Sequence, residues 1–285
     1  MKKTLIMSRR NIMLTLAYNG ANYCGWQVQP DSLSIQECVE RATEQLTGTR
    51  CSVLAASRTD SGVHAVGQVV NFLTDSSIPP QQYRRGLQRF LPDDITVVRS
   101  QQVHRGFHAT YSAVRKRYRY LIYDSDVLPP FLRGFVLHSH RALSLEPMQS
   151  AIEHLRGTHD FRCFETKYPN KATSVRTVME VSLERIVHWL PWQADHHWMP
   201  LNVRPHEAAE SPLILFEITA DGFLYNMVRA IIGTLIRIGL HQEPPEHVAD
   251  VIQSQDRRTA GNTMPPEGLY LMQVDYPAEL LVPEG

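Results

Sequence analysis

The chain has 285 residues, of which 43% are hydrophobic and 20% charged, and 29 basic side chains balance 29 acidic ones. That length suits one large domain or two ordinary ones. No apolar run approaches the roughly 18–20 residues of a membrane span, and the basic start lacks the apolar stretch of a secretory signal. The four cysteines form no Cys-x-x-Cys pair, which argues against a zinc ribbon or a disulfide framework and favours a cytoplasmic location.

The zero net charge conceals an uneven distribution. Residues 1–120 hold sixteen Lys and Arg against eight Asp and Glu, whereas residues 121–285 hold thirteen against twenty-one. A net charge of zero ordinarily argues against a nucleic-acid partner. The basic excess of the first part nevertheless indicates an anionic partner for one face.

Strands dominate the predicted elements. Alternating apolar residues predict a strand over 12–18. A turn-rich segment follows, and then a helix begins behind Ser34-Ile35-Gln36-Glu37, in which Ser34 and Glu37 form a capping box. Further strands are predicted at 52–56, 68–73, 95–101, 116–123, 176–184, 213–220 and 268–275. Further helices are predicted near Pro79, from a Ser144 cap to Gly157, over 223–238 and over 245–254.

This order of elements predicts an α+β fold with a largely antiparallel sheet. A weak internal repeat, strand-Asn19-Gly20-x-x-Tyr23-helix against strand-Asp221-Gly222-x-x-Tyr225-helix, suggests two similar halves. We place them at residues 1–110 and 111–285. The segment His188–Pro212 carries three tryptophans and no periodicity, so it is predicted to be an insertion between two strands.

The loop Arg58-Thr59-Asp60-Ser61-Gly62-Val63-His64 is the first candidate site. It lies between two predicted strands, where a rigid scaffold presents reactive side chains. Asp and Gly also favour ordinary surface turns, and from the local pattern alone that interpretation is preferred.

A basic strand is the second candidate. In Arg115-Lys116-Arg117-Tyr118-Arg119-Tyr120, alternation places Lys116 with the two tyrosines and the three arginines on the opposite face. Adjacent cations and aromatic rings suit a phosphate backbone and a stacked base. An edge strand protected by charge explains the pattern about equally well. Arg84, Arg85 and Arg89 form a second basic patch.

Arg229 lies within an apolar helix, where its charge must either be paired or reach solvent at the helix edge. Asp60 is one candidate partner among several. His196, His197 and His206 fit no common zinc spacing, so no metal site is predicted. Phosphate-binding glycine loops and a Gly-x-Ser-x-Gly elbow are absent from the sequence.

The segment from Arg58 to Ala65 resembles the Gly-Arg-Thr-Asp-Ala-Gly-Val-His-Ala signature of the tRNA pseudouridine synthase A family, with Ser57 and Ser61 in place of its Gly and Ala. Segments similar to other family landmarks follow in the same order over residues 12–276. They are Tyr18-Asn19-Gly20, Tyr23-Cys24-Gly25-Trp26-Gln27, Phe107-His108-Ala109, Lys116–Tyr120, Gly157–Phe161, Arg176–Val178, Met227–Gly233 and Glu267–Leu271.

The resemblance implies an enzyme that isomerises uridine to pseudouridine at positions 38–40 of the tRNA anticodon arm, without a cofactor and as a homodimer. It also implies two α/β halves that form one curved sheet, with helices on one face and an RNA-binding cleft on the other. Asp60 would be the nucleophile and Arg229 its partner. Tyr118 would stack on the uracil, and Leu271 would form an apolar floor beneath it.

Arg58 would hold the base out of its stack, and the other basic side chains would contact the RNA backbone. These candidates are Arg84, Arg85, Arg115, Lys116, Arg117 and Arg119. The insertion at 188–212 would contact tRNA, extend a dimer surface or, as we prefer, cover a sheet edge. Two other functions compete: a non-catalytic RNA-binding module, and a nucleoside hydrolase that uses Asp60 on a small molecule.

Overall fold

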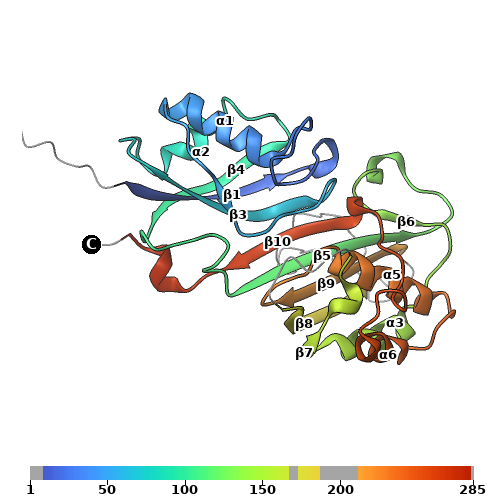
Figure 1. Ribbon diagram of the computed structural model, residues 1–285. Coiled ribbons are helices and arrows are strands. Elements are labelled where there is room, and N and C mark those ends of the chain that lie inside the picture. Colours follow the sequence, from blue (N-terminus) through green and yellow to red (C-terminus); the bar gives the residue numbers. More distant parts are fainter. Residues whose placement is uncertain (1–8, 167–172, 187–210, 284–285) are drawn as a thin grey trace, which may run out of the picture. The chain divides into compact units, whose positions relative to one another are not determined.

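The computed structural model describes residues 9–166, 173–186 and 211–283 (Figure 1). Its internal contacts divide the chain into two units. Unit 1 comprises Met1–Val114 and Gln273–Gly285, and unit 2 comprises Arg115–Met272. The sequence predicted a division after residue 110. The segment from Gln273 onward, which we had assigned to the second half, instead belongs to unit 1.

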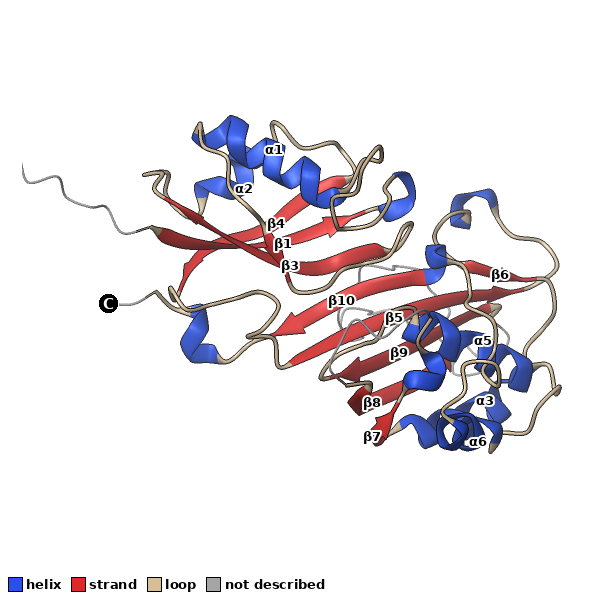
Figure 2. Ribbon diagram, in the orientation of Figure 1, coloured by secondary structure: helices blue, strands red, loops and turns tan. Residues whose placement is uncertain are grey.

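Over residues 9–114, unit 1 is a small antiparallel sheet with two α-helices. Its elements are β1 (Arg10–Tyr18), α1 (Ile35–Thr47), β2 (Leu54–Ala55), β3 (His64–Thr74), α2 (Gln82–Leu87) and β4 (Ile95–Val103). The strand order is β4-β1-β3, and β2 pairs with β3. Both helices lie on one face of this sheet (Figure 2), where Leu14, Ile35 and Leu87 are fully buried. From Leu14 to Tyr18 the buried residues of β1 alternate with half-buried ones, as expected for a strand with one face in the core, whereas Asn11 and Met13 on the other face are buried as well.

The capping signals at the ends of α1 are correct in part. Ser34 accepts a hydrogen bond from the Glu37 backbone N–H at 3.2 Å, as the capping box predicts. The Glu37 carboxylate pairs with Arg41, one turn further on. The helix ends at Gly48, which has a φ of 73°, a conformation that glycine adopts without steric penalty.

In its described residues, unit 2 has a larger sheet and three α-helices. Its elements are β5 (Arg115–Asp124), β6 (Leu137–Ser139), α3 (Leu145–Ile152), β7 (Gly157–Asp160), β8 (Val175–Arg185), β9 (Leu213–Ala220), α5 (Met227–Gly239), α6 (His247–Ser254) and β10 (Leu269–Asp275), of which the part from Gln273 onward belongs to unit 1. The strand order is β10-β5-β9-β8-β7, and the short β6 runs parallel to β5. The helices α3, α5 and α6 lie together in Figure 2, and α3 packs against both α5 and β8.

Short 3₁₀ helices complete the described elements. They span Gly20–Asn22, Pro130–Leu132, Glu153–Leu155, Arg162–Phe164, Pro266–Gly268 and Ala278–Leu281. Taken together, the antiparallel strands and packed helices of the two units confirm the predicted α+β class.

Two sequence signals in unit 2 misplaced a helix terminus or its cap. The helix predicted from Phe223 begins at Met227, because Asn226 has a φ of 62° and breaks the periodic pattern. Ser144 precedes α3 as predicted, but its side chain does not cap the helix. Its Oγ atom instead lies 2.7 Å from Nε2 of His241. The partner of Ser144 is distant in the sequence, so a local pattern does not encode this contact.

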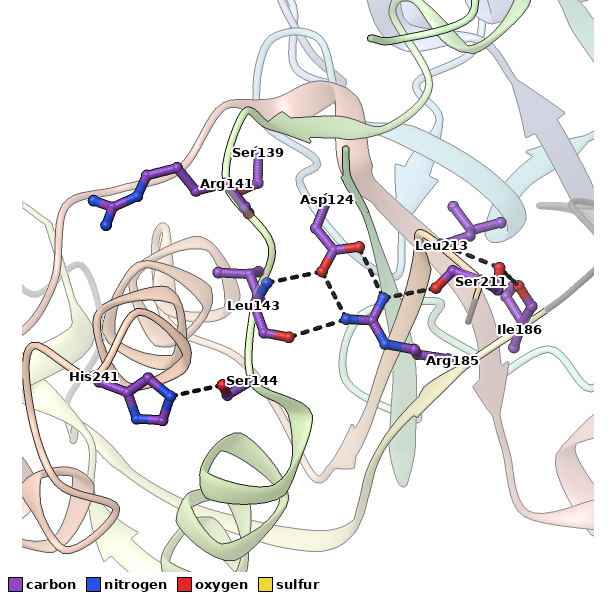
Figure 3. Close-up of polar contacts among 10 residues, drawn as sticks. All are labelled: Asp124, Ser139, Arg141, Leu143, Ser144, Arg185, Ile186, Ser211, Leu213 and His241. Carbon is purple, nitrogen blue, oxygen red and sulfur yellow. Dashed lines mark hydrogen bonds and ion pairs between the residues drawn. The ribbon is translucent and has the colours of Figure 1, made fainter. Parts of the chain in front are cut away.

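A buried ion pair joins the ends of β5 and β8 (Figure 3). The Arg185 guanidinium makes two hydrogen bonds to the Asp124 carboxylate, at 2.8 and 2.7 Å. It also donates to the carbonyl oxygens of Ser211 and Leu143, and the Leu143 N–H donates to Asp124 at 2.9 Å. Each charged group is thus hydrogen-bonded, as burial of an ion pair requires. The pair therefore links the end of β8 to the end of β5 and to Ser211, which lies two residues before the start of β9.

Candidate functional site

The Asp60 loop joins β2 to β3 in unit 1. Asp60 is half-buried, Thr59 is buried, and Arg58 and Ser61 are exposed. The Val63 N–H donates to the Asp60 carbonyl oxygen at 3.1 Å, and Gly62 between them has a φ of 78°. The signature glycine therefore permits a tight turn directly after the aspartate.

The Tyr18–Gln27 segment packs backbone to backbone against this loop. The Trp26 N–H donates to the Thr59 carbonyl oxygen at 3.0 Å. Gly25 has a φ of 105°, and a Cβ atom there would lie 2.7 Å from the same oxygen. The Ser61 hydroxyl donates to the Tyr23 carbonyl oxygen at 3.2 Å. The two sequence motifs therefore pack against each other within unit 1. Ser61, which replaces the signature alanine, adds a hydrogen bond between them.

A buried histidine, His64, holds the end of the Asp60 loop that leads into β3. His64 is 1% exposed, and its Nδ1 atom accepts a hydrogen bond from the Gly20 N–H at 3.1 Å. An accepting Nδ1 places the ring proton of a neutral histidine on Nε2. The loop is thus fixed before and after Asp60.

Tyr118 and Arg229 belong to unit 2, where the loop between β9 and α5 contacts both of them. The Tyr118 side chain is 6% exposed. Its ring centre lies 4.9 Å from that of Phe223, at an interplanar angle of 79°, an edge-to-face arrangement favourable for aromatic rings. Asn226 of the same loop accepts a hydrogen bond from Nη1 of Arg229 at 2.8 Å. One loop therefore orients the predicted stacking residue and the predicted charged residue.

Arg229 is held at the N-terminus of α5 rather than extended along its edge. Its Nε atom donates to the Met264 carbonyl oxygen at 2.6 Å, and the Met264 N–H donates to the Arg229 carbonyl oxygen at 3.2 Å. Burial and a negative charge on Glu267 raise the pKa of the nearby Tyr120, whereas the positive charge of Arg229 lowers it. The hydrogen bonds to Met264 and Asn226 thus hold the helix arginine in one position.

The segment that holds Arg229 lies directly on the backbone of α5. A Cβ atom on Gly233 would be 1.9 Å from the Asn262 carbonyl oxygen, and one on Gly261 would be 2.2 Å from the Gly233 carbonyl carbon. The Gly261 N–H donates to the Thr234 hydroxyl at 2.9 Å. The two glycines therefore allow residues 261–264 to reach the arginine.

The predicted RNA-backbone contacts fall into two groups. Arg84 and Arg85 are exposed on α2, and Arg115, Lys116 and Arg117 are half-buried on β5. Arg119 is only 5% exposed, and its Nε and Nη2 atoms donate to Glu217 of β9 at 3.0 and 2.8 Å. Arg119 therefore forms a structural ion pair with Glu217 inside unit 2 and is no longer a candidate for contact with the RNA backbone.

Leu271, the predicted apolar floor, lies in β10 with no exposed surface. Asp60 and Arg58 belong to unit 1, whereas Tyr118, Arg229 and Leu271 belong to unit 2. The geometry above describes each group within its own unit, and the meeting of Asp60 with Arg229 stays a prediction.

The described residues add two findings on metals and membranes. Within 9–166, 173–186 and 211–283, no three His, Cys, Asp or Glu side chains gather as ligands of a metal ion would. His196, His197 and His206, and most of the insertion predicted at 188–212, lie outside the described residues. In the described part of the chain, no helix is both long and apolar enough to cross a membrane.

Unit 1 holds the Asp60 carboxylate on a loop fixed by hydrogen bonds, and unit 2 holds Tyr118 and Arg229 beside a second loop. A family model described as tRNA pseudouridine synthase matches residues 15–112 and 151–277, more than half of the chain. The chain therefore belongs to the tRNA pseudouridine synthase family and is an isomerase.

Curated relatives agree with this assignment. The chain is 43% identical over 267 residues to tRNA pseudouridine synthase A of Acetivibrio thermocellus, and the match covers 94% of this chain and all of the relative. It is 39% identical to the protein of the same name from Thermoanaerobacter sp., with the same coverage. It is 40% identical to the one from Syntrophomonas wolfei, over 96% of this chain and 99% of the relative.

Local sequence patterns missed the residues that support the Asp60 loop. Gly20 belongs to the internal repeat, His64 to the end of the candidate loop and Gly25 to a family landmark, but the sequence assigns none of them a supporting role, since their partners lie far along the chain. One local signal existed for Gln68. It is a polar residue within the apolar strand β3 and is completely buried, and a buried polar group must find a hydrogen-bond partner.

Proposed function

We propose that this enzyme converts uridine to pseudouridine at positions 38–40 of the tRNA anticodon stem-loop, with Asp60 as the nucleophile. The reaction breaks the C1′–N1 bond, rejoins C1′ to C5, and moves a proton from C5 to N1, so it needs neither hydrolysis nor redox chemistry. Family membership supports the reaction class. The single observation that carries the assignment of Asp60 is its place on a loop fixed at Thr59, Ser61 and His64 by hydrogen bonds to the Tyr18–Gln27 segment.

Three further side chains take roles around Asp60 in this proposal. Arg229 pairs with the carboxylate and keeps it ionised, since a neighbouring guanidinium favours the charged form. Its hydrogen bonds to the Met264 carbonyl oxygen and the Asn226 side chain support a fixed position for the guanidinium. Tyr118 stacks on the uracil and relays the proton lost from C5, and Leu271 lies beneath the base.

The target uridine must leave its stack to reach Asp60, which costs a few kcal/mol. Stacking on one aromatic side chain returns about 1–3 kcal/mol. Arg58, exposed two residues before Asp60, holds the base out of the helix. Arg84, Arg85, Arg115, Lys116 and Arg117 contact the phosphates and supply most of the remaining affinity. We further propose that the enzyme is cytoplasmic and works as a homodimer.

The test compares the wild-type enzyme with Asp60→Asn, which removes the nucleophile while keeping the size of the side chain. Carbodiimide mapping of tRNA after incubation should show pseudouridine at positions 38–40 with the wild type and none with Asp60→Asn, although both bind tRNA. Asp75→Asn is the matched control, because Asp75 is an exposed carboxylate of the same unit, and it should retain full activity.

The outcomes separate the competing functions. Undiminished product from Asp60→Asn would disprove the nucleophile assignment. Binding of tRNA without any product from the wild type would favour an RNA-binding module. Release of free uracil, independent of tRNA, would favour a nucleoside hydrolase.

A further inference from the structure

The side-chain amide of Gln68, in β3, makes the hydrogen bonds to the chain after β2 that the backbone of a paired strand would otherwise make. The backbone of β2 pairs with β3 at Leu54 and Ala55, and the Ala56 N–H still donates to the Val69 carbonyl oxygen at 2.8 Å. Beyond this point the Gln68 amide continues the pairing. Its Oε1 accepts from the Ser57 N–H at 3.3 Å, and its Nε2 donates to the Ser57 carbonyl oxygen at 2.7 Å.

Tyr18, at the end of β1, extends this support to Thr59. Its hydroxyl accepts from Nε2 of Gln68 at 3.3 Å and lies 2.7 Å from the Thr59 hydroxyl. Gln68, Tyr18 and Thr59 are 0%, 5% and 6% exposed, respectively. Burial raises the pKa of Tyr18 to about 12, so the hydroxyl keeps its proton at neutral pH.

The network fixes the two residues on either side of Arg58. Ser57 is held through its backbone and Thr59 through its hydroxyl, and Asp60 follows directly. A core that needed only packing would be served by an apolar side chain of the same length, because a buried amide loses its hydration and must recover it in hydrogen bonds. Among the described residues, the Gln68 side chain makes its hydrogen bonds to this loop and to the tyrosine that supports it.

We propose that Gln68 and Tyr18 are positioning residues for the reaction: they hold Ser57 and Thr59 so that the Asp60 carboxylate and the Arg58 side chain face the target nucleotide. This inference rests on the proposed role of Asp60. A misplacement of about 1 Å in a reacting group lowers rates by about a hundredfold, so the effect of losing the network falls on the chemical step rather than on tRNA affinity.

The test uses single-turnover pseudouridine formation with saturating full-length enzyme. Gln68→Met keeps the length of the side chain and removes the amide, and Tyr18→Phe removes only the hydroxyl. Each should lower the rate of the chemical step by about 10- to 100-fold, while the Kd for tRNA stays within about threefold of the wild-type value.

Gln68→Glu supplies a conservative rescue. A protonated carboxylic acid reproduces both hydrogen bonds to Ser57, since its carbonyl oxygen accepts from the Ser57 N–H and its O–H donates to the Ser57 carbonyl oxygen, but it has no second hydrogen to donate to the Tyr18 hydroxyl. The ionised form loses that donor and adds a negative charge close to Asp60. Burial raises the pKa of such a carboxyl group. Relative to the wild type, Gln68→Glu should therefore be impaired near pH 8.5 and should recover as the pH falls toward 6, a range in which Tyr18 does not titrate.

Gln88 is the matched control. Its amide also makes two hydrogen bonds to backbone in unit 1, but to β4 rather than to the Asp60 loop. It accepts from the Val97 N–H at 3.1 Å and donates to the Ile95 carbonyl oxygen at 2.9 Å. Gln88→Met should lower the melting temperature and leave the single-turnover rate unchanged.

Two results would overturn the proposal. One is a Gln68→Met rate within threefold of the wild type. The other is that Gln68→Met and Gln88→Met both lose single-turnover rate, each in proportion to its loss of melting temperature. A wild-type enzyme that forms no pseudouridine would instead refute the proposed function.

Discussion

Gly20 and Val63 are in backbone contact: a Cβ atom added to Gly20 would lie 2.0 Å from the Val63 carbonyl oxygen. Real Cβ atoms do not approach an oxygen so closely, and the obstacle is backbone rather than a flexible side chain. The contact lies between the turn after β1 and the turn after Asp60. The glycine of the first motif is therefore required by the position of the second motif, and not by its own backbone conformation.

The first prediction concerns Gly20→Ala. The added methyl group must push the two turns apart, as overpacking does elsewhere at about 1–3 kcal/mol, and Asp60 moves with its loop. We expect the free energy of unfolding to fall by that amount and the single-turnover rate to fall more than tenfold. Urea denaturation and a pseudouridine assay on the folded variant measure the two effects.

Gly48→Ala is the control for this prediction. Gly48 has a φ of 73° and no atom within 4 Å of an added Cβ, so alanine there costs only its left-handed backbone conformation, about 1 kcal/mol. We expect a similar loss of stability with an unchanged rate. Equal rates for the two variants would contradict the role given to the Gly20–Val63 contact.

The second prediction concerns Arg119 and Glu217, whose side chains are 6% and 14% exposed. Removing one member of a buried pair leaves an uncompensated charge, which costs about 3–5 kcal/mol. Arg119→Met should therefore lower the free energy of unfolding by about that amount, measured by urea denaturation. The double variant Arg119→Met, Glu217→Met should recover most of the loss, because it removes both charges.

Arg117 provides the comparison on the same strand. Its side chain is 27% exposed and lies 3.7 Å from Glu180, an ion pair expected to contribute less than about 1 kcal/mol. Arg117→Met should instead weaken tRNA binding and reduce the salt dependence of that binding by about one phosphate contact. A larger loss of stability from Arg117→Met than from Arg119→Met would reverse these assignments.

The third prediction concerns Gly233→Ala on α5. The added Cβ would meet the Asn262 carbonyl oxygen, so residues 261–264 must move and the Met264 carbonyl oxygen must leave Arg229. We expect both stability and the rate of pseudouridine formation to fall. Gly239→Ala on the same helix would mainly meet the side chain of Met148, which can change rotamer, and should keep most of the activity. Equal rates for the two alanine variants would disprove the link to Arg229.

The fourth prediction concerns alkaline pH. Burial raises the pKa of Tyr18 to about 12, and it raises the pKa values of Tyr120, Tyr270 and Tyr276 as well. In the unfolded chain a tyrosine loses its proton near pH 10. Since the folded pKa lies above the unfolded one, this stability is complete below about pH 10 and is lost as the pH rises toward 12.

Urea denaturation at a series of pH values measures that loss, and absorbance of the phenolate reports tyrosine ionisation directly. In the folded enzyme several tyrosines should resist ionisation until the chain unfolds. Complete, reversible ionisation of all tyrosines near pH 10 without unfolding would contradict the prediction.

Elements whose signal is local were predictable from the sequence. The strand predicted at 213–220 corresponds to β9 (Leu213–Ala220), and the helix predicted behind Ser34 corresponds to α1. Both signals lie in the order of apolar and polar residues within a single element, which neighbouring residues encode. The predicted start of α5 was wrong because Asn226 adopts a left-handed backbone conformation, which the spacing of apolar residues does not reveal.

By itself, the sequence determined the α+β class and, through resemblance, the family and the candidate residues Asp60, Tyr118 and Arg229. Only the tertiary structure decided that Arg119 is buried against Glu217, that Gly20 must be glycine because of Val63, and that Gln68 reaches Ser57. These partners lie on other strands and turns, and a local pattern records the burial of a residue but not its neighbour. Hydrogen bonds, ion pairs and close backbone contacts depend on that neighbour, so they became visible only once the chain had folded.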